Sequence, residues 1–123
     1  MQEFEFDIIG MGAVRTTAKG KSFDERFQRY ARYKTALRMF LRGVGIKECP
    51  ERFEITFVMP FPISYTQKQR KELEGQPHRY KPDLDNLVKG FIDCFGKDDS
   101  GVHEFYARKI WGKDGKIILK VVN

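Results

Sequence analysis

The sequence predicts a single α+β domain in which helices pack against a mixed or antiparallel sheet. Two kinds of periodicity support this prediction. Segments that alternate apolar and polar residues, as half-buried strands do, recur near both ends of the chain and in its middle. Segments with apolar residues at helical spacing lie between them. No repeat, low-complexity segment or linker divides the chain, so one domain over residues 1–123 in the order β-α-β-(α)-α-β-β is expected.

The first half of the chain supplies two strands and one long helix. Residues 3–8 alternate Phe and Ile with acidic residues and predict a strand. Residues 10–21 form a loop whose glycines and cations either contact phosphates or make a plain connection. Ser22 and Glu25 fit a capping box, which predicts a helix to about Arg42. The apolar stripe expected on this helix comprises Phe27, Tyr30, Leu37, Phe40 and Leu41. Residues 53–59 alternate again and predict the second strand.

The second half begins with a weak helix and continues with a strong one. Residues 64–67 are another capping-box candidate, with Ser64 as N-cap, for a short helix that ends near Gly75. This segment has almost no apolar stripe, so it should lie at the periphery. Residues 84–95 carry the cleanest helical stripe in the chain, and Asp83 is the natural N-cap.

The chain ends in two predicted strands. Residues 102–111 and 117–121 both favour extended structure, and the glycine-containing turn between them predicts a hairpin.

The charge distribution favours a polyanionic partner. The net charge is +6, residues 15–43 contain nine Lys and Arg against two acidic residues, and residues 65–82 contain five against two. Clustering of this kind favours nucleic acid, and a solvated, solubilising face is the alternative. Tyr30 and Tyr33 interleave with the arginines and suit a nucleic-acid face. The basic residues expected to hold DNA are Arg26, Arg29, Arg32, Lys68, Arg70, Lys71, Arg79 and Lys81.

Composition argues against several other classes of protein. No apolar run approaches the length of a membrane span and no signal-type segment is present, so a cytoplasmic protein without a membrane partner is expected. Cys49 and Cys94 lie in no C-x-x-C or Cys/His cluster, which gives a zinc site little support.

Two acidic clusters flank the strong helix. Asp83 and Asp85 lie at its start, and Asp98 and Asp99 follow its end, about 20 Å away at ~1.5 Å per residue. Helix capping and an ion pair of Asp85 with Lys89, one turn further on, would explain the first pair without any function. A chain that runs back after the helix would instead bring the clusters together. Spacing alone does not decide between these interpretations.

A shared carboxylate site would have a definite chemistry. Several carboxylates in one place repel one another unless a cation neutralises them, and oxygen ligands favour Mg²⁺ or Mn²⁺. On a basic protein such a site suits phosphodiester hydrolysis. Lys89 would stabilise the transition state or orient the attacking water.

An ordered set of residues in the second half of the chain resembles the RusA family of Holliday junction resolvases. The set comprises KPDLDNLVK at 81–89, Asp93, DDSGV at 98–102, and Lys109 before the Trp-Gly pair at 111–112. The resemblance is strong over 59–112 and architectural over 1–58. Gly96 and Lys97 precede the second acidic pair, where family members commonly place a bulky residue.

The resemblance implies a RusA-like domain that acts as a homodimeric crossover junction endodeoxyribonuclease. The cofactor would be Mg²⁺, with Mn²⁺ as a substitute, and paired symmetric nicks in a four-way DNA junction would serve recombination and repair. Asn86 is expected to fix the local geometry through its amide. By position, the catalytic residues are Asp83, Asp85, Asp99 and Lys89, and the metal ligands are Asp83, Asp85 and Asp99 with Asp98 as an acidic neighbour.

Two alternatives remain at this point. The first alternative to a junction resolvase is a non-catalytic nucleic-acid-binding module whose acidic residues only cap a helix. The second is a nuclease that acts on other branched DNA. The family is often carried by phages and prophages, which indicates a bacterial setting. Of the remaining polar residues, His78 is expected to be solvent-exposed, Asp93 structural or solvated, and Lys109 solvated or in contact with DNA.

Overall fold

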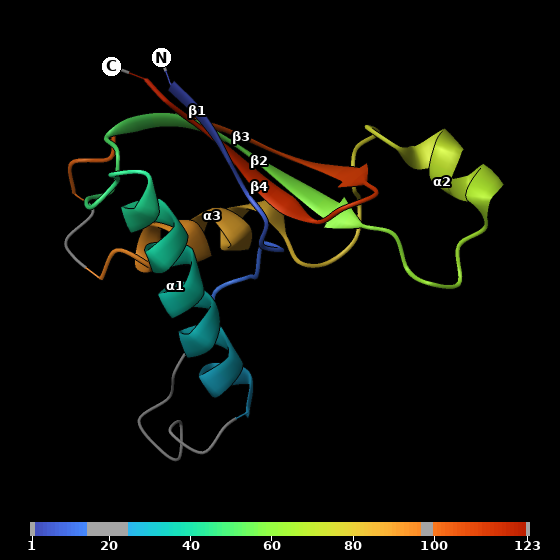
Figure 1. The fold of residues 1–123 in the computed structure, drawn as a ribbon, viewed down its shortest axis with the longest axis horizontal. Coiled ribbons are helices and arrows are strands. Elements are labelled where there is room, and N and C mark those ends of the chain that lie inside the picture. Colours follow the sequence, from blue (N-terminus) through green and yellow to red (C-terminus); the bar gives the residue numbers. More distant parts are fainter. Residues whose placement is uncertain (1, 15–24, 97–99, 123) are drawn as a thin grey trace.

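The computed structural model describes residues 2–14, 25–96 and 100–122 and confirms the predicted α+β class. Helices α1 and α3 pack against one face of a four-stranded sheet, and no described helix covers the other face (Figure 1). Both chain ends lie at the same edge of the molecule. The elements are β1 (Gln2–Phe6), α1 (Glu25–Gly43), β2 (Arg52–Pro60), α2 (Gln67–Leu73), α3 (Leu84–Asp93), β3 (Glu104–Gly112) and β4 (Lys116–Val121).

The sheet is mixed, with the strand order β1-β4-β2-β3. Strand β4 is antiparallel to both β1 and β2, and β3 is parallel to β2. The predicted hairpin of β3 with β4 is therefore wrong. The turn after Gly112 passes over the end of β2, whose last residue, Pro60, lies beside Gly112 in the ladder. This places the apolar strand β4 in the sheet interior, where its Ile117 and Leu119 side chains are fully buried.

The core lies between the helices and the inner face of the sheet. Alternate residues of β2 and β4 meet the apolar stripe of α3, as the spacing predicts. Each large side chain buried in this way contributes roughly 1.5–3 kcal/mol. The fully buried side chains of this core include Phe53, Phe57, Ile117, Leu119, Leu87, Phe91, Leu37 and Leu41. Because α3 is anchored along its whole stripe, its first turn is held firmly in place.

The buried face of α1 agrees in part with the predicted stripe, since Tyr30, Leu37 and Leu41 are buried. Tyr30 and Tyr33 are 2% and 8% exposed and face the core, so the prediction that they form a nucleic-acid face is wrong. Phe40, expected in the apolar stripe, is 41% exposed. Residues 30, 33, 37 and 41 set the helical phase, which leaves four arginines toward solvent, namely Arg26, Arg29, Arg32 and Arg42. No helix in the described ranges is long and apolar enough to cross a bilayer.

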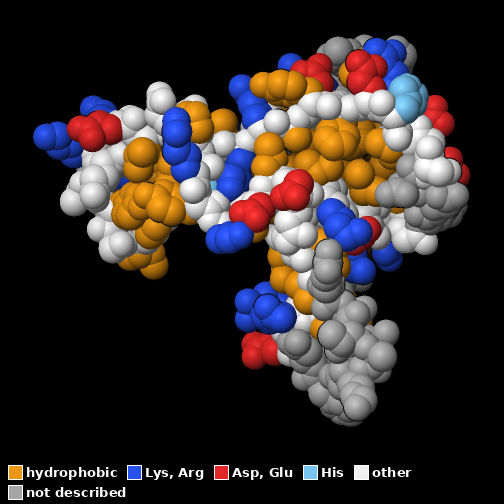
Figure 2. Space-filling model, turned by 180° about the vertical axis from the view of Figure 1, so that it is seen from behind, with side chains coloured by type: hydrophobic (Ala, Val, Ile, Leu, Met, Phe, Trp, Pro, Cys, Tyr) orange, Lys and Arg blue, Asp and Glu red, His pale blue; other side chains and the backbone are white. Residues whose placement is uncertain are grey.

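Helix α2 is peripheral, as predicted, and has no buried residue. Its N-cap is Thr66 rather than Ser64. The Gln69 backbone N–H donates to Thr66 Oγ1 at 3.1 Å, and the Thr66 N–H donates to Gln69 Oε1 at 2.8 Å. Figure 2 shows this segment as a lobe that stands apart from the body of the molecule. Stacking of Phe61 on Trp111 at 5.6 Å, with Tyr65 at 5.7 Å, anchors the chain that leads into the lobe.

Candidate active site

Asp83 holds the N-cap position of α3 without capping the helix. Its backbone is extended, with φ −68° and ψ 146°, as an N-cap requires, but its side chain makes no capping hydrogen bond. Its Oδ2 instead accepts a hydrogen bond of 2.9 Å from Lys81 Nζ, and the two side chains are 58% and 85% exposed. Helix capping therefore does not account for this carboxylate.

Asp85 is exposed in the first turn of α3. Its Oδ1 accepts a hydrogen bond from the adjacent Asn86 backbone N–H at 2.9 Å. The ion pair with Lys89 that a purely structural role would require is not formed among the described residues, because Lys89 Nζ lies 4.0 Å from Asp93 Oδ1 instead. The positive end of the helix dipole stabilises the charge of both Asp83 and Asp85. The two carboxylates thus share one helix start and retain accessible oxygens.

Asn86 ties the start of α3 to the segment after β1, which confirms its predicted role. Its Nδ2 donates to the Ala13 carbonyl at 3.0 Å, and the Ala13 N–H donates to the Asn86 carbonyl at 3.1 Å. Gly12 permits this approach, since a Cβ there would lie 2.6 Å from Asn86 Nδ2. Residues 10–14 are therefore packed against α3. The remainder of the predicted loop, with the Ser22 cap, lies outside the described residues.

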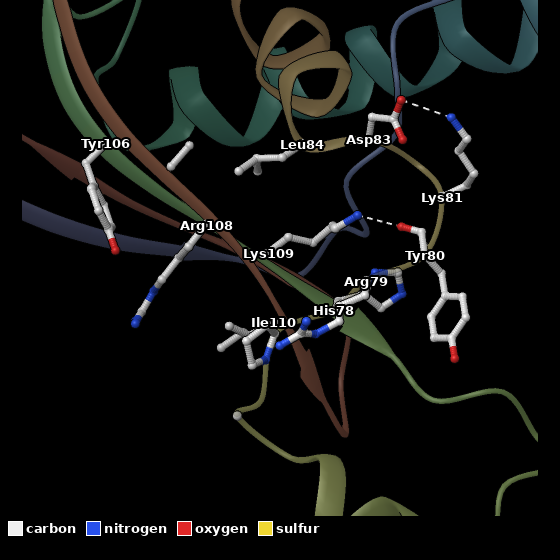
Figure 3. Close-up of a pocket in the computed structure, with 13 residues that line it drawn as sticks. His78, Arg79, Tyr80, Lys81, Asp83, Leu84, Tyr106, Arg108, Lys109 and Ile110 are labelled. Atoms are coloured by element: carbon white, nitrogen blue, oxygen red, sulfur yellow. Dashed lines mark hydrogen bonds and ion pairs between the residues drawn. The ribbon is translucent and has the colours of Figure 1, made fainter.

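Lys109 supports the loop that leads into α3. Its Nζ donates to the Tyr80 carbonyl at 2.5 Å (Figure 3) and to the Pro82 carbonyl at 2.6 Å. The peptide bond between Lys81 and Pro82 in this loop is cis. Burial lowers the pKa of Lys109 and neighbouring Lys81 lowers it further, whereas the Asp83 charge opposes the shift. The alternation of β3 is the sequence signal for this role, because Lys109 falls on the same strand face as the apolar residues Ala107 and Trp111.

An open cavity of about 870 Å³ lies beside Asp83, between the loop and β3 (Figure 3). Its lining combines cations with aromatic rings. Cations hold phosphates, and exposed aromatic faces accept bases, so this composition suits a nucleic-acid strand. Sequence reasoning missed Tyr80, Tyr106 and Arg108 as lining residues. The basic and aromatic lining residues are Arg79, Lys81, Arg108, Lys109, Tyr80 and Tyr106.

His78 is not solvent-exposed as expected. Its side chain is 9% exposed, and its ring lies 4.3 Å from the Trp111 ring, centroid to centroid. Burial lowers the pKa of His78, as does the nearby Lys109 charge. His78 therefore belongs to the aromatic cluster that secures the base of the α2 lobe.

The eight basic residues expected to hold DNA fall in three places: three on α1, three on α2 and two on the cavity wall. Arg29 forms an exposed ion pair with Glu25 at 3.4 Å. Arg70 is occupied within its own loop, where it donates to the carbonyls of Tyr65, Pro62 and Ile63. Of the eight, Arg79 and Lys81 line the same cavity as Asp83. Contact of the eight residues with DNA stays a prediction.

The proposed metal ligands are described in part. Asp98 and Asp99 lie outside the described residues, so their approach to Asp83 and Asp85 stays a prediction. Within residues 2–14, 25–96 and 100–122, no three His, Cys, Asp or Glu side chains converge as a metal site would require. The donor chemistry of the described pair fits Mg²⁺, because Asp83 makes no capping bond and Asp85 uses only Oδ1 for its bond with the Asn86 N–H, so both side chains offer a carboxylate oxygen to a cation.

Comparison with known proteins agrees with the geometry of this region. A family model described as endodeoxyribonuclease RusA matches residues 7–122, which is nearly the whole chain. No match is found among curated proteins. The match includes most of the N-terminal half, over which the sequence resembles the family in its architecture and not in specific motif residues. The chain therefore belongs to the RusA family of endodeoxyribonucleases.

Proposed function

We propose that this RusA-family chain is a Mg²⁺-dependent nuclease that resolves four-way DNA junctions by paired symmetric nicks, as a homodimer, in recombination and repair. One observation carries the proposal. Asp83 and Asp85 lie exposed at the start of α3, Asp83 makes no capping hydrogen bond, Asp85 contacts only the adjacent Asn86 N–H among the described residues, and a basic cavity opens beside them. A purely structural role for the two carboxylates would leave both features unexplained.

Asp83 and Asp85 would hold the Mg²⁺ ion together with Asp99, with Asp98 as an acidic neighbour, and Mn²⁺ is expected to substitute. When bound, the ion would supply an activated water and offset the charge that develops on the phosphate. Lys89 is 63% exposed, and its ion pair with Asp93 at 4.0 Å is a weak surface contact. Its ammonium is therefore free to reorient toward a phosphate at the start of the helix.

The cavity beside Asp83 would hold the strand that is cut. Arg79 and Lys81, which line this cavity, provide cations for the phosphates. Asn86 and Lys109 act as positioning residues, because they hold the chain on either side of the acidic pair. The arginines of α1 would contact the backbone of a further duplex arm.

The test compares synthetic four-way, three-way and linear DNA, each with Mg²⁺, with Mn²⁺ or with a chelator. The wild-type protein should nick the four-way junction symmetrically when a metal is present. Asp83→Asn should abolish nicking and retain binding, and Asp114→Asn, in an exposed turn, serves as the matched control. Full activity of Asp83→Asn would refute the metal-site assignment. An intact junction after long incubation would favour a binding module, and equal cutting of three-way DNA would favour a broader branched substrate.

A further inference from the structure

Strand β3 is an edge strand whose outer side is only partly covered. Residues 75–78 pair with its C-terminal half, where the His78 N–H donates to the Lys109 carbonyl at 3.0 Å and the Gly75 N–H donates to the Trp111 carbonyl at 2.9 Å. Outward-pointing backbone groups alternate along a strand. Those of Phe105 and Ala107 therefore also point outward, and no described residue forms a backbone hydrogen bond with them on that side.

The uncovered half of β3 exposes two large aromatic side chains. Phe105 and Tyr106 are 47% and 61% exposed. The opposite edge of the sheet is different, since β1 is short and neither of its aromatic side chains, Phe4 and Phe6, is exposed. Exposed edges that carry large apolar side chains tend to pair with another strand.

We infer that this edge pairs in antiparallel fashion with the same edge of a second copy, about a two-fold axis at Tyr106. The available segment is residues 104–108, because β3 begins at Glu104 and the chain's own His78 covers the edge from Lys109 onward. A five-residue segment that pairs with itself has its symmetry axis at the central residue. The inference takes the dimer from the proposed function and identifies the surface through which the two copies would associate.

The side chains are complementary in this register. Glu104, which pairs with Arg52 of its own chain at 2.7 Å, would also face Arg108 of the second copy, and the reverse pair would repeat the contact across the axis. Phe105 would face the small side chain of Ala107, and the two residues would exchange backbone hydrogen bonds with their counterparts. Opposite charges and well-matched apolar pairs across strands each stabilise by about 0.2–1 kcal/mol, and like charges destabilise. A shift of the register by two residues would set Glu104 against Tyr106 and remove both charge pairs.

The same edge borders the candidate active site. Tyr106, Ala107 and Arg108 line the cavity beside Asp83, so a second copy at this edge would form part of the wall of each cavity. Paired symmetric cuts require two sites related by a two-fold axis, and an isologous interface provides that relation.

Charge exchange tests the pairing and its register together. Glu104→Arg alone, or Arg108→Glu alone, places like charges opposite each other at both ends of the paired segment. An equimolar mixture of the two variants restores opposite charges at both ends. By sedimentation, we expect each single variant to dimerise about tenfold or more weakly than wild type, and the mixture to form dimers again.

Two controls separate the interface from folding. Glu3→Arg makes the same charge change on the opposite edge and should leave the dimer intact. Ala107→Pro removes an outward N–H and leaves the hydrogen bonds to β2 in place, so it should weaken the dimer with little change in circular dichroism. A monomeric wild type, or single variants that dimerise as wild type does, would overturn the inference. A wild-type dimer that leaves junctions intact would refute the proposed function and leave this interface standing.

Discussion

At the C-terminal end of α3, the Asp93 carboxylate accepts a hydrogen bond of 2.9 Å from the buried Tyr30 hydroxyl, and its side chain is 35% exposed. At the N-terminal end, Asp83 contacts exposed Lys81, and Asp85 contacts the backbone N–H of Asn86. Both ends belong to one helix with one buried stripe. The C-terminal carboxylate joins α3 to α1. The contacts of the N-terminal pair among the described residues stay within residues 81–86 and connect α3 to no other helix or strand.

This difference separates structural carboxylates from available ones. A carboxylate that satisfies a buried hydroxyl cannot be replaced without leaving that hydroxyl unpaired, which costs about 1–3 kcal/mol. An exposed carboxylate without a capping bond contributes little to folding, so its presence at a helix start beside a basic cavity calls for another explanation. The comparison thus assigns stability to one end of α3 and function to the other.

The largest expected effect is on catalysis at the N-terminal end. Asp85→Asn should lower junction cleavage by more than the roughly 10–100-fold loss that follows removal of a group supporting a metal ligand. The free energy of unfolding should change by less than about 0.5 kcal/mol, because the side chain is exposed. Single-turnover cleavage and chemical denaturation measure the two quantities. Loss of stability without loss of cleavage would reverse the assignment of the two ends.

The next effect is on stability at the C-terminal end. Asp93→Ala should lower the free energy of unfolding by about 1–3 kcal/mol, because the Tyr30 hydroxyl loses its partner in the core. Tyr30→Phe removes the hydroxyl as well as the need for a partner, so its cost should be smaller. Cleavage by both variants should match wild type well below their midpoints of unfolding. A hundredfold loss of cleavage in Asp93→Ala would move the functional site to this end.

Local patterns in the sequence predict the N-terminal end of α3 well. The stripe of Leu87, Phe91 and their neighbours sets the face of the helix, and Pro82 fixes where it begins. The positions of Asp83 and Asp85 follow from these two signals alone. The approach of Asp99 depends on how the chain returns after Gly96, which no periodicity specifies.

Pairing between distant segments is where prediction from sequence fails. The turn after Gly112 has the residues of a hairpin turn, yet β4 pairs with β1 and β2 because its apolar side chains belong in the sheet interior. The supporting role of Lys109 depends on the same pairing, since the register of β3 on β2 brings it beside the loop at Pro82. His78 was misjudged because its burial depends on Trp111, 33 residues away in the chain by their numbers.

The smallest effect concerns pH and again separates the two ends. Burial raises the pKa of Cys94, which follows α3, from 9.0 to about 12. Burial and the Asp93 hydrogen bond also raise the pKa of Tyr30. A raised pKa in the folded state means that the unfolded chain loses its proton first. The stabilising contribution is therefore complete below the unfolded pKa and is lost as the pH rises toward the folded one.

The free energy of unfolding should accordingly fall with rising pH from about pH 9 for Cys94 and about pH 10 for Tyr30, each toward its own folded pKa. Cys94→Ala should flatten the first part of this fall, although it lowers stability at neutral pH by leaving a cavity. Asp83→Asn should leave the alkaline profile unchanged, since no burial couples that carboxylate to folding. Denaturation followed at several pH values measures each slope. An alkaline slope that responds to Asp83→Asn and not to Cys94→Ala would show that the N-terminal end of α3, rather than the C-terminal end, is coupled to the core.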